Sequence, residues 1–352
     1  MIIGYKTTCM KWLVSLGIIY FLTIFHPGFS QSSFANREAY LDDTSCIQAV
    51  LVTNMGRVFS HSKHGDISYG HFITLLPDGK KIDDNILLEI RGHFRQGYCF
   101  VPPLKLKFNY KDSAVLCYLK SLKMVSECKV TAENDQNLLK EYLIYKMYNL
   151  FTSRSFHDRL LYLTFEDSAG KKKPITEHAF FLEDISDVAR RNNCLQWKEK
   201  NFNTEMTDRK QMTLVALFEF MIGNTDWAVS VNHNTRLIVL SQDTFSKPFV
   251  VPYDFDYSGL INTEYAAPDE KLEIENVTQR LYRGFARTMP ELEEELDTFR
   301  LLKKDIYALI NNFSLLTQKN KEAMIAYLDG FYEVINNKKM VKNLFIDNVR
   351  KE

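Results

Sequence analysis

The sequence predicts an α+β fold with two lobes, a β-rich half over residues 31–185 and a mainly helical half over residues 186–352. Three observations lead to this prediction. Residues 46–108 alternate apolar and polar side chains in the manner of strands. From residue 186 onward the apolar residues follow helical periodicity instead. A chain of 352 residues, 45% of them apolar, is also long enough for two lobes or one large domain.

The N-terminal residues predict a cleaved secretory leader. Lys6 and Lys11 precede the apolar run Trp12–Phe25, which His and Pro then interrupt. A bilayer span needs about 20 apolar residues, so this run suits the apolar region of a signal peptide over residues 1–30, with cleavage after Ser30. The alternative is an uncleaved N-terminal anchor. The first interpretation predicts an exported protein, periplasmic or extracellular, with no stable membrane span after cleavage.

Charge and cysteine content narrow the class of protein. The 44 basic residues balance the 44 acidic ones, which argues against a nucleic-acid partner. Beyond the leader the cysteines are Cys46, Cys99, Cys117, Cys128 and Cys194. An odd number argues against a full disulfide framework. Cys117 and Cys128 could pair across a hairpin, or both could be buried free thiols. No Cys-x-x-Cys or His-Glu-x-x-His occurs, so neither common zinc motif is present.

Each element of the β-rich half follows from a local pattern. Segments that alternate apolar and polar residues between Gly and Asp turn signals predict strands over 47–52, 69–76, 86–90 and 104–108. A further hairpin is predicted within 115–125, and a strand pair over 159–165 and 177–184. Apolar residues at helical spacing predict one helix in this half, over 137–151.

The helical half has clear start and stop signals. Residues 207–222 predict a helix that Gly223 ends, because glycine suits the left-handed C-terminal cap. Pro290 and the acids that follow it predict the first turn of a helix over about 290–313. A second long helix is expected over about 317–337. No chemistry is assigned to these last two helices.

Four oxygen-bearing side chains lie at the ends of apolar elements between residues 217 and 260. Asp226 follows the helix that ends at Gly223, Asn234 precedes the apolar run that begins at Leu237, and Asp254 and Asp256 follow the next apolar run. One acid that orients a nucleophile, with an Asn and a second acid that hold Mg²⁺, is an arrangement of phosphoryl-transfer enzymes. Each residue alone is an ordinary turn residue, so the interpretation depends on their combined order.

This segment resembles known kinases. Phe-Met-Ile-Gly-Asn-Thr-Asp at 220–226, an Asn that opens a strand, and Val-Pro-Tyr-Asp at 251–254 resemble the active-site segment of HipA-like kinases. CotH-type spore-coat kinases, with a Trp-Asp-x-Asp variant of the last motif, are similar. Arg91–Arg95 resembles another CotH segment, from which His93 and Phe94 depart. The whole chain resembles secreted proteins of Bacteroidetes-type bacteria with this layout.

The resemblance implies a bilobal protein-kinase-like fold and a role for each candidate residue. Asp226 would be the catalytic carboxylate, and Asn234 and Asp254 would bind Mg²⁺ or Mn²⁺ with Asp256 as an additional ligand. Lys123 would contact the phosphates of ATP and Glu141 would hold that lysine. The strand exit at Phe181 and Glu183 would be the hinge against which the adenine lies. The partners would be a nucleotide and a protein or small-molecule hydroxyl acceptor.

Three departures from the kinase pattern leave other functions open. Asn234 follows Asp226 by eight positions, a longer spacing than kinase patterns have, and Asn232 follows it by six. Trp227 and Ala228 stand where related kinases carry Arg and His, and the chain has no Gly-x-Gly phosphate loop. One alternative is therefore a non-catalytic binding or surface-assembly protein on the same scaffold. Another is a metal-dependent hydrolase that uses Asp254 and Asp256 on water.

Overall fold

Seven strands form a closed barrel in the first half of the chain. The computed structural model describes residues 36–60, 63–75, 79–91, 99–108, 114–201 and 203–349, so the predicted leader lies outside the described residues. The barrel strands are β1 Ile47–Thr53, β2 Ile67–Leu75, β3 Lys81–Ile90, β4 Leu104–Lys107, β5 Ser121–Ser126, β6 Asp158–Asp167 and β7 Ile175–Leu182. Their order is β1-β2-β3-β4-β5-β7-β6. The barrel closes where β1 pairs with β6 in parallel, and every other neighbouring pair is antiparallel.

The predicted bilobal kinase-like fold, with a β-sheet lobe and a helical lobe, is therefore wrong. The first half is a closed mixed barrel, and a separate three-stranded sheet of order β10-β9-β8 accompanies the helices of the second half. Alternation identifies residues that form strands, but it does not reveal which strands pair. The closing pair joins Ile47 to Leu161, a contact between segments far apart in the chain that no local pattern encodes.

The barrel has a core of its own, built from the apolar side chains that alternate along its strands. Phe72, Phe108 and Phe181 are fully buried in its interior, where Phe181 lies 5.9 Å from each of the other two rings. The short helix α2 (Met55–Ser60) packs on β6. The alternation that predicts the strands is thus the inward and outward alternation of barrel walls.

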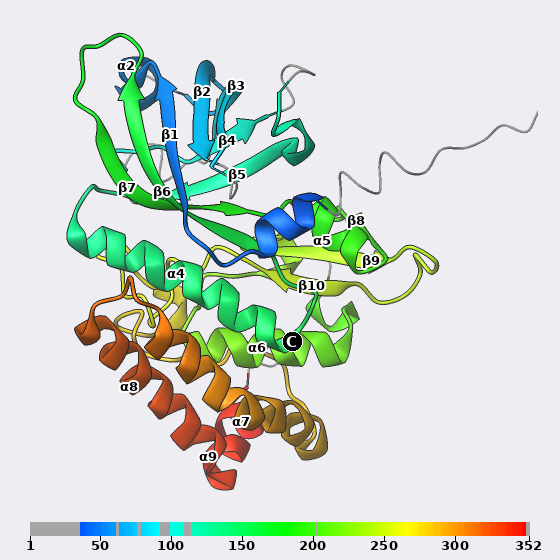
Figure 1. Cartoon of the computed structure of the whole chain (residues 1–352). Coiled ribbons are helices and arrows are strands. Elements are labelled where there is room, and N and C mark those ends of the chain that lie inside the picture. The colour runs from blue at the N-terminus through cyan, green and yellow to red at the C-terminus, as the bar shows by residue number, and fades with distance from the viewer. Residues whose placement is uncertain are drawn as a thin grey trace, which may run out of the picture.

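Helix α4 (Ala132–Phe151) runs between the barrel and the helices below it (Figure 1). It begins at Ala132, ahead of the predicted 137, because its first turn is polar and carries no apolar pattern. The Thr131 side chain caps this turn by accepting a hydrogen bond from the backbone N–H of Asn134. Most of α4 packs into the second hydrophobic core, together with the helices of the second half.

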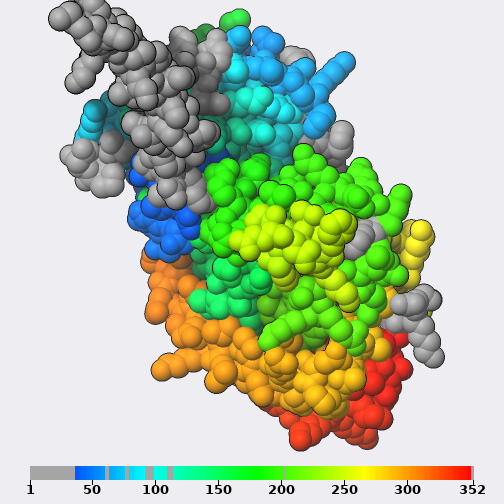
Figure 2. All heavy atoms as spheres, turned by 90° about the vertical axis from the view of Figure 1, so that its right-hand side faces the viewer, coloured from blue at the N-terminus to red at the C-terminus, as the bar shows by residue number. Residues whose placement is uncertain are grey.

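The second half surrounds the small sheet with helices. The sheet contains β8 Cys194–Trp197, β9 Thr235–Leu240 and β10 Phe249–Pro252. The helices are α5 Ile185–Arg191, α6 Arg209–Ile222, α7 Met289–Asn312, α8 Gln318–Ile335 and α9 Lys338–Lys342. Short helical turns cover Cys117–Leu119, Thr204–Met206, Val229–Val231, Glu270–Leu272 and Asn343–Asp347. In the space-filling view, the green to yellow-green middle part of the chain lies between the blue and cyan N-terminal part and the orange to red C-terminal part (Figure 2).

The predicted helices of this half are confirmed to within a few residues. Gly223 ends α6 with φ 68°, in the left-handed region that the glycine cap requires. Thr288 and Glu291 form a reciprocal capping box at the start of α7, with Pro290 in its first turn. Across the described part of the chain, every helix is too short or too polar to span a bilayer.

One disulfide corrects the cysteine prediction. Cys99 bonds to Cys128, and Cys117 is a free thiol. Neither alternative is therefore right, because Cys128 pairs with a cysteine other than Cys117 and is not free. Cys117 lies in a short helical turn rather than in the predicted hairpin strand. The bond joins the segment that precedes β4 to the segment between β5 and α4, and the backbone N–H of Phe100 also donates to the carbonyl of Cys128 at 2.8 Å. Two barrel loops are thereby tied together.

Candidate functional site

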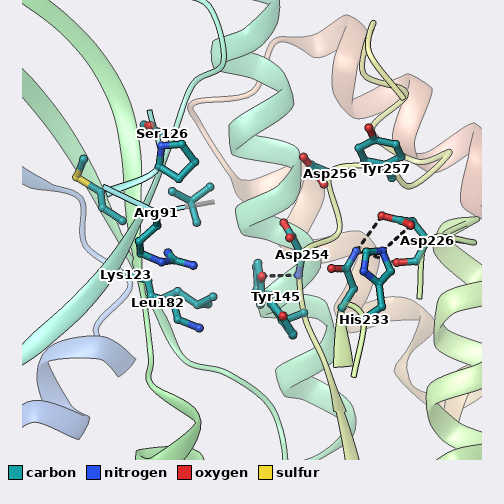
Figure 3. A pocket seen from close by; sticks show the side chains of 15 residues that line it. Arg91, Lys123, Ser126, Tyr145, Leu182, Asp226, His233, Asp254, Asp256 and Tyr257 are labelled. Carbon is teal, nitrogen blue, oxygen red and sulfur yellow. Dashed lines mark hydrogen bonds and ion pairs between the residues drawn. The ribbon is translucent and has the colours of Figure 1, made fainter. Parts of the chain in front are cut away.

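A cavity of about 570 Å³ separates the end of the barrel from the small sheet. Figure 3 shows its two walls. The barrel contributes Arg91 after β3, Lys123 and Ser126 on β5, and Leu182 at the end of β7. The opposite wall is lined by Tyr145 of α4 and by Asp226, His233, Asn234, Tyr253, Asp254, Asp256 and Tyr257. The four predicted oxygen-bearing residues and the predicted lysine therefore line one cavity.

The end of helix α6 fixes the position of Asp226. A Cβ on Gly223 would collide with the hydroxyl of Tyr327, so glycine is required here for space as well as for its backbone angle. Beyond the cap, the Asn224 side chain accepts a hydrogen bond from the backbone N–H of Asp226 at 3.0 Å. Arg283 donates to the backbone carbonyls of Thr225 and Trp227, on either side of Asp226. The backbone that carries this carboxylate is thus held from two directions.

Both carboxylate oxygens of Asp226 have partners. Nε2 of His233 lies 2.8 Å from Oδ1, and Nδ2 of Asn234 donates to Oδ2 at 3.0 Å and to the Asp226 carbonyl at 2.7 Å. Because the Nδ2 end of the Asn234 amide is used in this way, its Oδ1 end is the one that can face a cation. The Asp226 side chain remains 36% exposed. An ionised carboxylate has about four lone-pair sites, so Asp226 can accept a further hydrogen bond from a bound molecule.

A fully buried acid lies behind Asp226. Burial raises the pKa of Glu219 to about 8, although the neighbouring Asn224 amide and the charge of Arg283 oppose that shift. Burial thus favours the protonated, neutral form of Glu219 behind the site.

Asp254 and Asp256 leave strand β10 through a tight bend. Asp254 has φ 66°, a left-handed conformation that Asp and Asn tolerate better than most residues. Its backbone N–H donates to the hydroxyl of Tyr145 at 2.9 Å, which anchors the bend on α4. The Asp256 carboxylate accepts a hydrogen bond from the Tyr265 hydroxyl at 2.9 Å. The backbone at Asp254 and the carboxylate of Asp256 are thus each held by a tyrosine hydroxyl.

The barrel wall carries the positive charge of the site. Burial, reinforced by the charges of Arg91 and Arg236, lowers the pKa of Lys123 to about 8. Burial also lowers the pKa of Arg91, and the charge of Asp254 opposes this shift. The Lys123 ammonium lies 5.5 Å from the centre of the Tyr253 ring. Two cations on one wall therefore face three carboxylates on the other, across a space that can accept a charged molecule.

Three of the predicted site residues do not line this cavity. Glu141 is buried on α4 and lines a smaller adjoining cavity, while the acids whose charges act on Lys123 are Asp184 and Asp254. Phe181 is in the barrel core. Glu183 is buried in an ion pair with Arg191 at 2.9 Å, and its backbone N–H donates to the carbonyl of His157. The strand exit thus presents Leu182 to the cavity, because successive side chains of a strand point to opposite faces.

Two functional candidates were not assigned a role from the sequence. Arg91 belongs to the Arg91–Arg95 segment that resembles CotH-type proteins, and residues 92–98 lie outside the described residues. The backbone N–H of Arg91 donates to the carbonyl of Pro103 at 2.8 Å. His233 directly precedes Asn234 in the sequence. Its position beside a candidate metal ligand is the feature that could have identified it as a site residue. Arg91 and Lys123 supply positive charge from the barrel, where Trp227 and Ala228 do not.

The donor atoms of this cavity fit a magnesium or manganese ion better than zinc. Among the described residues, no group of three or more His, Cys, Asp or Glu side chains is close enough to hold a metal. A cation here would therefore use one or two carboxylates, the Asn234 amide oxygen, and water or phosphate oxygens. Mg²⁺ takes this kind of ligand set in nucleotide sites. The described lining contains one histidine and no cysteine, which does not suit zinc.

Neither any protein-family model nor any curated protein matches this chain. The geometry of the cavity and the residues that line it are the features that bear on function.

Proposed function

We propose that this protein transfers the γ-phosphoryl group of ATP to a hydroxyl acceptor, with Mg²⁺ or Mn²⁺ as cofactor. The observation that carries this proposal is the opposition of charges across one cavity of about 570 Å³. Arg91 and Lys123 suit the phosphates, and Asn234, Asp254 and Asp256 suit the cation that accompanies them. The volume is within the range of about 300 to 1,000 Å³ that small-molecule sites occupy.

The residues of the cavity divide into three roles. The apolar surfaces of Val125 and Leu182 on the barrel wall would contact the base, in place of the hinge assigned to Phe181 and Glu183. Lys123 and Arg91 would offset the charge of the phosphates. A bound divalent cation would neutralise the charge that develops on the phosphate oxygens.

Asp226 would act on the acceptor. The acceptor hydroxyl donates a hydrogen bond to the carboxylate, which orients its oxygen toward the γ-phosphorus. The new bond forms between that oxygen and the γ-phosphorus while the bond to the bridging oxygen of the β-phosphate breaks. The proton of the hydroxyl passes to Asp226. His233 and Asn234 hold the carboxylate in place through the contacts at 2.8 and 3.0 Å.

We also propose that the protein works outside the cytosol. The Cys99–Cys128 disulfide supports this location, because disulfides persist in oxidising compartments and are rare in the cytosol. The N-terminal apolar run supports it independently.

Thermal stability with nucleotide tests the proposed function. Mg-ATP at about 100 times its dissociation constant should stabilise the protein by about 2.7 kcal/mol, which raises Tm by about 4 °C for a chain of this length. Asp254→Asn keeps a residue that tolerates the left-handed backbone but removes a charged ligand, so its shift should be lost. Asp243→Asn, in the exposed loop between β9 and β10, makes the same chemical change away from the cavity and should shift like the wild type.

The outcomes separate the roles. An equal shift for Asp254→Asn and wild type would exclude Asp254 as a metal ligand. The absence of a shift in any protein would exclude the nucleotide and favour a non-catalytic binding protein. Release of inorganic phosphate at the same rate with and without acceptor would favour the hydrolase.

Nucleotide affinity is expected to fall above pH 8. The lowered pKa of Lys123 means that its ammonium loses a proton near pH 8 in the free protein, whereas triphosphate binds the charged form. Binding then requires proton uptake, and the association constant decreases by up to about tenfold per pH unit above 8. Calorimetric titration of ATP at several pH values, from roughly 6.5 to about 9.5, brackets this pKa and measures how the association constant depends on pH. Lys123→Arg stays charged throughout and should have a flat profile; a sloping profile for Lys123→Arg would assign the effect to another group.

A further inference from the structure

A second cavity meets the first at Asp226. Its volume is about 220 Å³, and Asp226, His233 and Tyr257 line both cavities. On the far side of Asp226 it is lined by Trp227, Asp269 and Arg283. A molecule in this second cavity would therefore reach the same carboxylate as a molecule in the first.

The size of the second cavity limits what it can hold. A volume of 220 Å³ lies below the range of about 300 to 1,000 Å³ typical of sites for drug-sized ligands. One water molecule takes up about 30 Å³ in the liquid. The space thus suits a small polar compound of roughly the size of one sugar ring, and not a folded segment of another protein.

The charges around the second cavity favour a positively charged occupant. Two carboxylates, Asp226 and Asp269, and one guanidinium, Arg283, line it. The Nη1 group of Arg283 already donates to two backbone carbonyls, and its charge already faces both of these carboxylates. Among the charged side chains that line the cavity, the two carboxylates thus outnumber the one guanidinium.

Asp269 is positioned to form an ion pair with a cationic ligand at the solvent-exposed side of this cavity. It is an exposed residue that lines the cavity, and its Oδ1 caps the Glu270–Leu272 turn by accepting from the Lys271 N–H at 3.0 Å. Its other oxygen has lone pairs for a ligand. The aromatic side chain of Tyr257 also lines the space, and such rings attract cations.

We propose that this second cavity binds the phosphoryl acceptor, and that the acceptor is a small hydroxyl compound carrying an ammonium group, such as an amino sugar. The ammonium lies toward Asp269 and the hydroxyl reaches Asp226. This inference rests on the proposed phosphoryl transfer for its chemistry. The preference for a cationic small molecule rests on the cavity itself.

Three sugars of one size but different charge test the inference. Glucosamine, glucose and glucuronate are titrated by calorimetry into the full protein, and turnover with Mg-ATP is measured for each. Glucosamine should exceed glucuronate by at least about tenfold in both affinity and kcat/KM, with glucose between them, because the net negative lining favours one charge and opposes the other. The preference should weaken as salt is added, since Asp269 is exposed.

Two variants test whether the preference for glucosamine depends on Asp269. Asp269→Asn keeps the cap of the helical turn and removes one charge, so the ratio of glucosamine to glucose should fall toward one through a higher KM for glucosamine, with kcat nearly unchanged. Asp243→Asn should leave the ratio at the wild-type value. An unchanged ratio in Asp269→Asn, a preference for glucuronate, or phosphorylation of a serine peptide and of none of the sugars would overturn the inference.

The binding measurements distinguish a failure of this inference from a failure of the proposed function. If Mg-ATP gives no thermal shift while glucosamine binds with the stated preference, the second cavity stands as a cationic-sugar site and phosphoryl transfer is excluded. If Mg-ATP binds and the three sugars bind equally or not at all, the acceptor assignment is overturned and the nucleotide site stands.

Discussion

Asp226→Asn is expected to lower kcat for phosphoryl transfer by about 10³-fold, within the range of roughly 10² to 10⁴ for a positioned proton acceptor. The amide keeps the size of the side chain and can still accept a hydrogen bond from His233 or Asn234, but it cannot take the proton of the acceptor hydroxyl. Because Asp226 lies at the meeting point of both cavities, the loss should appear in kcat rather than in the KM for ATP. Single-turnover assays with saturating Mg-ATP measure it.

Two controls make this result specific. Asp243→Asn should retain full activity, and the Tm of Asp226→Asn should stay within a few degrees of the wild type, since the Arg283 contacts to the backbone around residue 226 remain. A loss below about tenfold would exclude Asp226 as the proton acceptor. A loss of the thermal shift with Mg-ATP would instead assign Asp226 to the metal.

Removal of the Cys99–Cys128 disulfide is expected to cost about 3.6 kcal/mol of unfolding free energy. The bond closes a loop with a sequence separation of 29, and the chain-entropy account gives a cost of this size for such a loop. The double variant Cys99→Ser with Cys128→Ser, measured by urea unfolding, should show this loss. Cys117→Ser, which replaces a free thiol, should lose far less.

The same variant should also bind nucleotide more weakly. Cys128 comes two residues after Ser126 of the cavity, and Cys99 belongs to the connection between β3 and β4 that begins with Arg91. Without the bond, the segment that carries Arg91 is held to the β5–α4 connection by fewer contacts. An unchanged free energy of unfolding, or full stability of the wild type in dithiothreitol, would show that the disulfide does not hold these loops together.

Local features of this chain could be predicted from its sequence because their causes are local. Gly223 is required at the end of α6, and Pro290 lies in the first turn of α7, as their positions indicated. The acids after α6 and β10 and the Asn before β9 also line one cavity, because elements that end at a common edge bring their terminal residues together. Their order along the chain was the usable signal.

The rest depended on contacts between distant segments. The closure of the barrel, the Cys99–Cys128 pairing and the approach of Arg91 to Asp254 all join residues whose partners no window of sequence contains. The assignment of Phe181 and Glu183 to the site came from resemblance to families with a different architecture. In a closed barrel an alternate strand residue faces the interior, and Phe181 does so.

The parallel pairing of β1 with β6 has a consequence for synthesis. In this pairing Val52 and Thr53 lie opposite Glu166 and Asp167. During synthesis, β1 therefore leaves the ribosome more than a hundred residues before the strand with which it pairs in parallel. Until then a nascent chain exposes an unpaired strand edge, which invites pairing with other chains. Closure at such long range is slow, because the loop entropy is lost before the contact is gained. The barrel is therefore completed only after the segments that form β6 and β7 have been made.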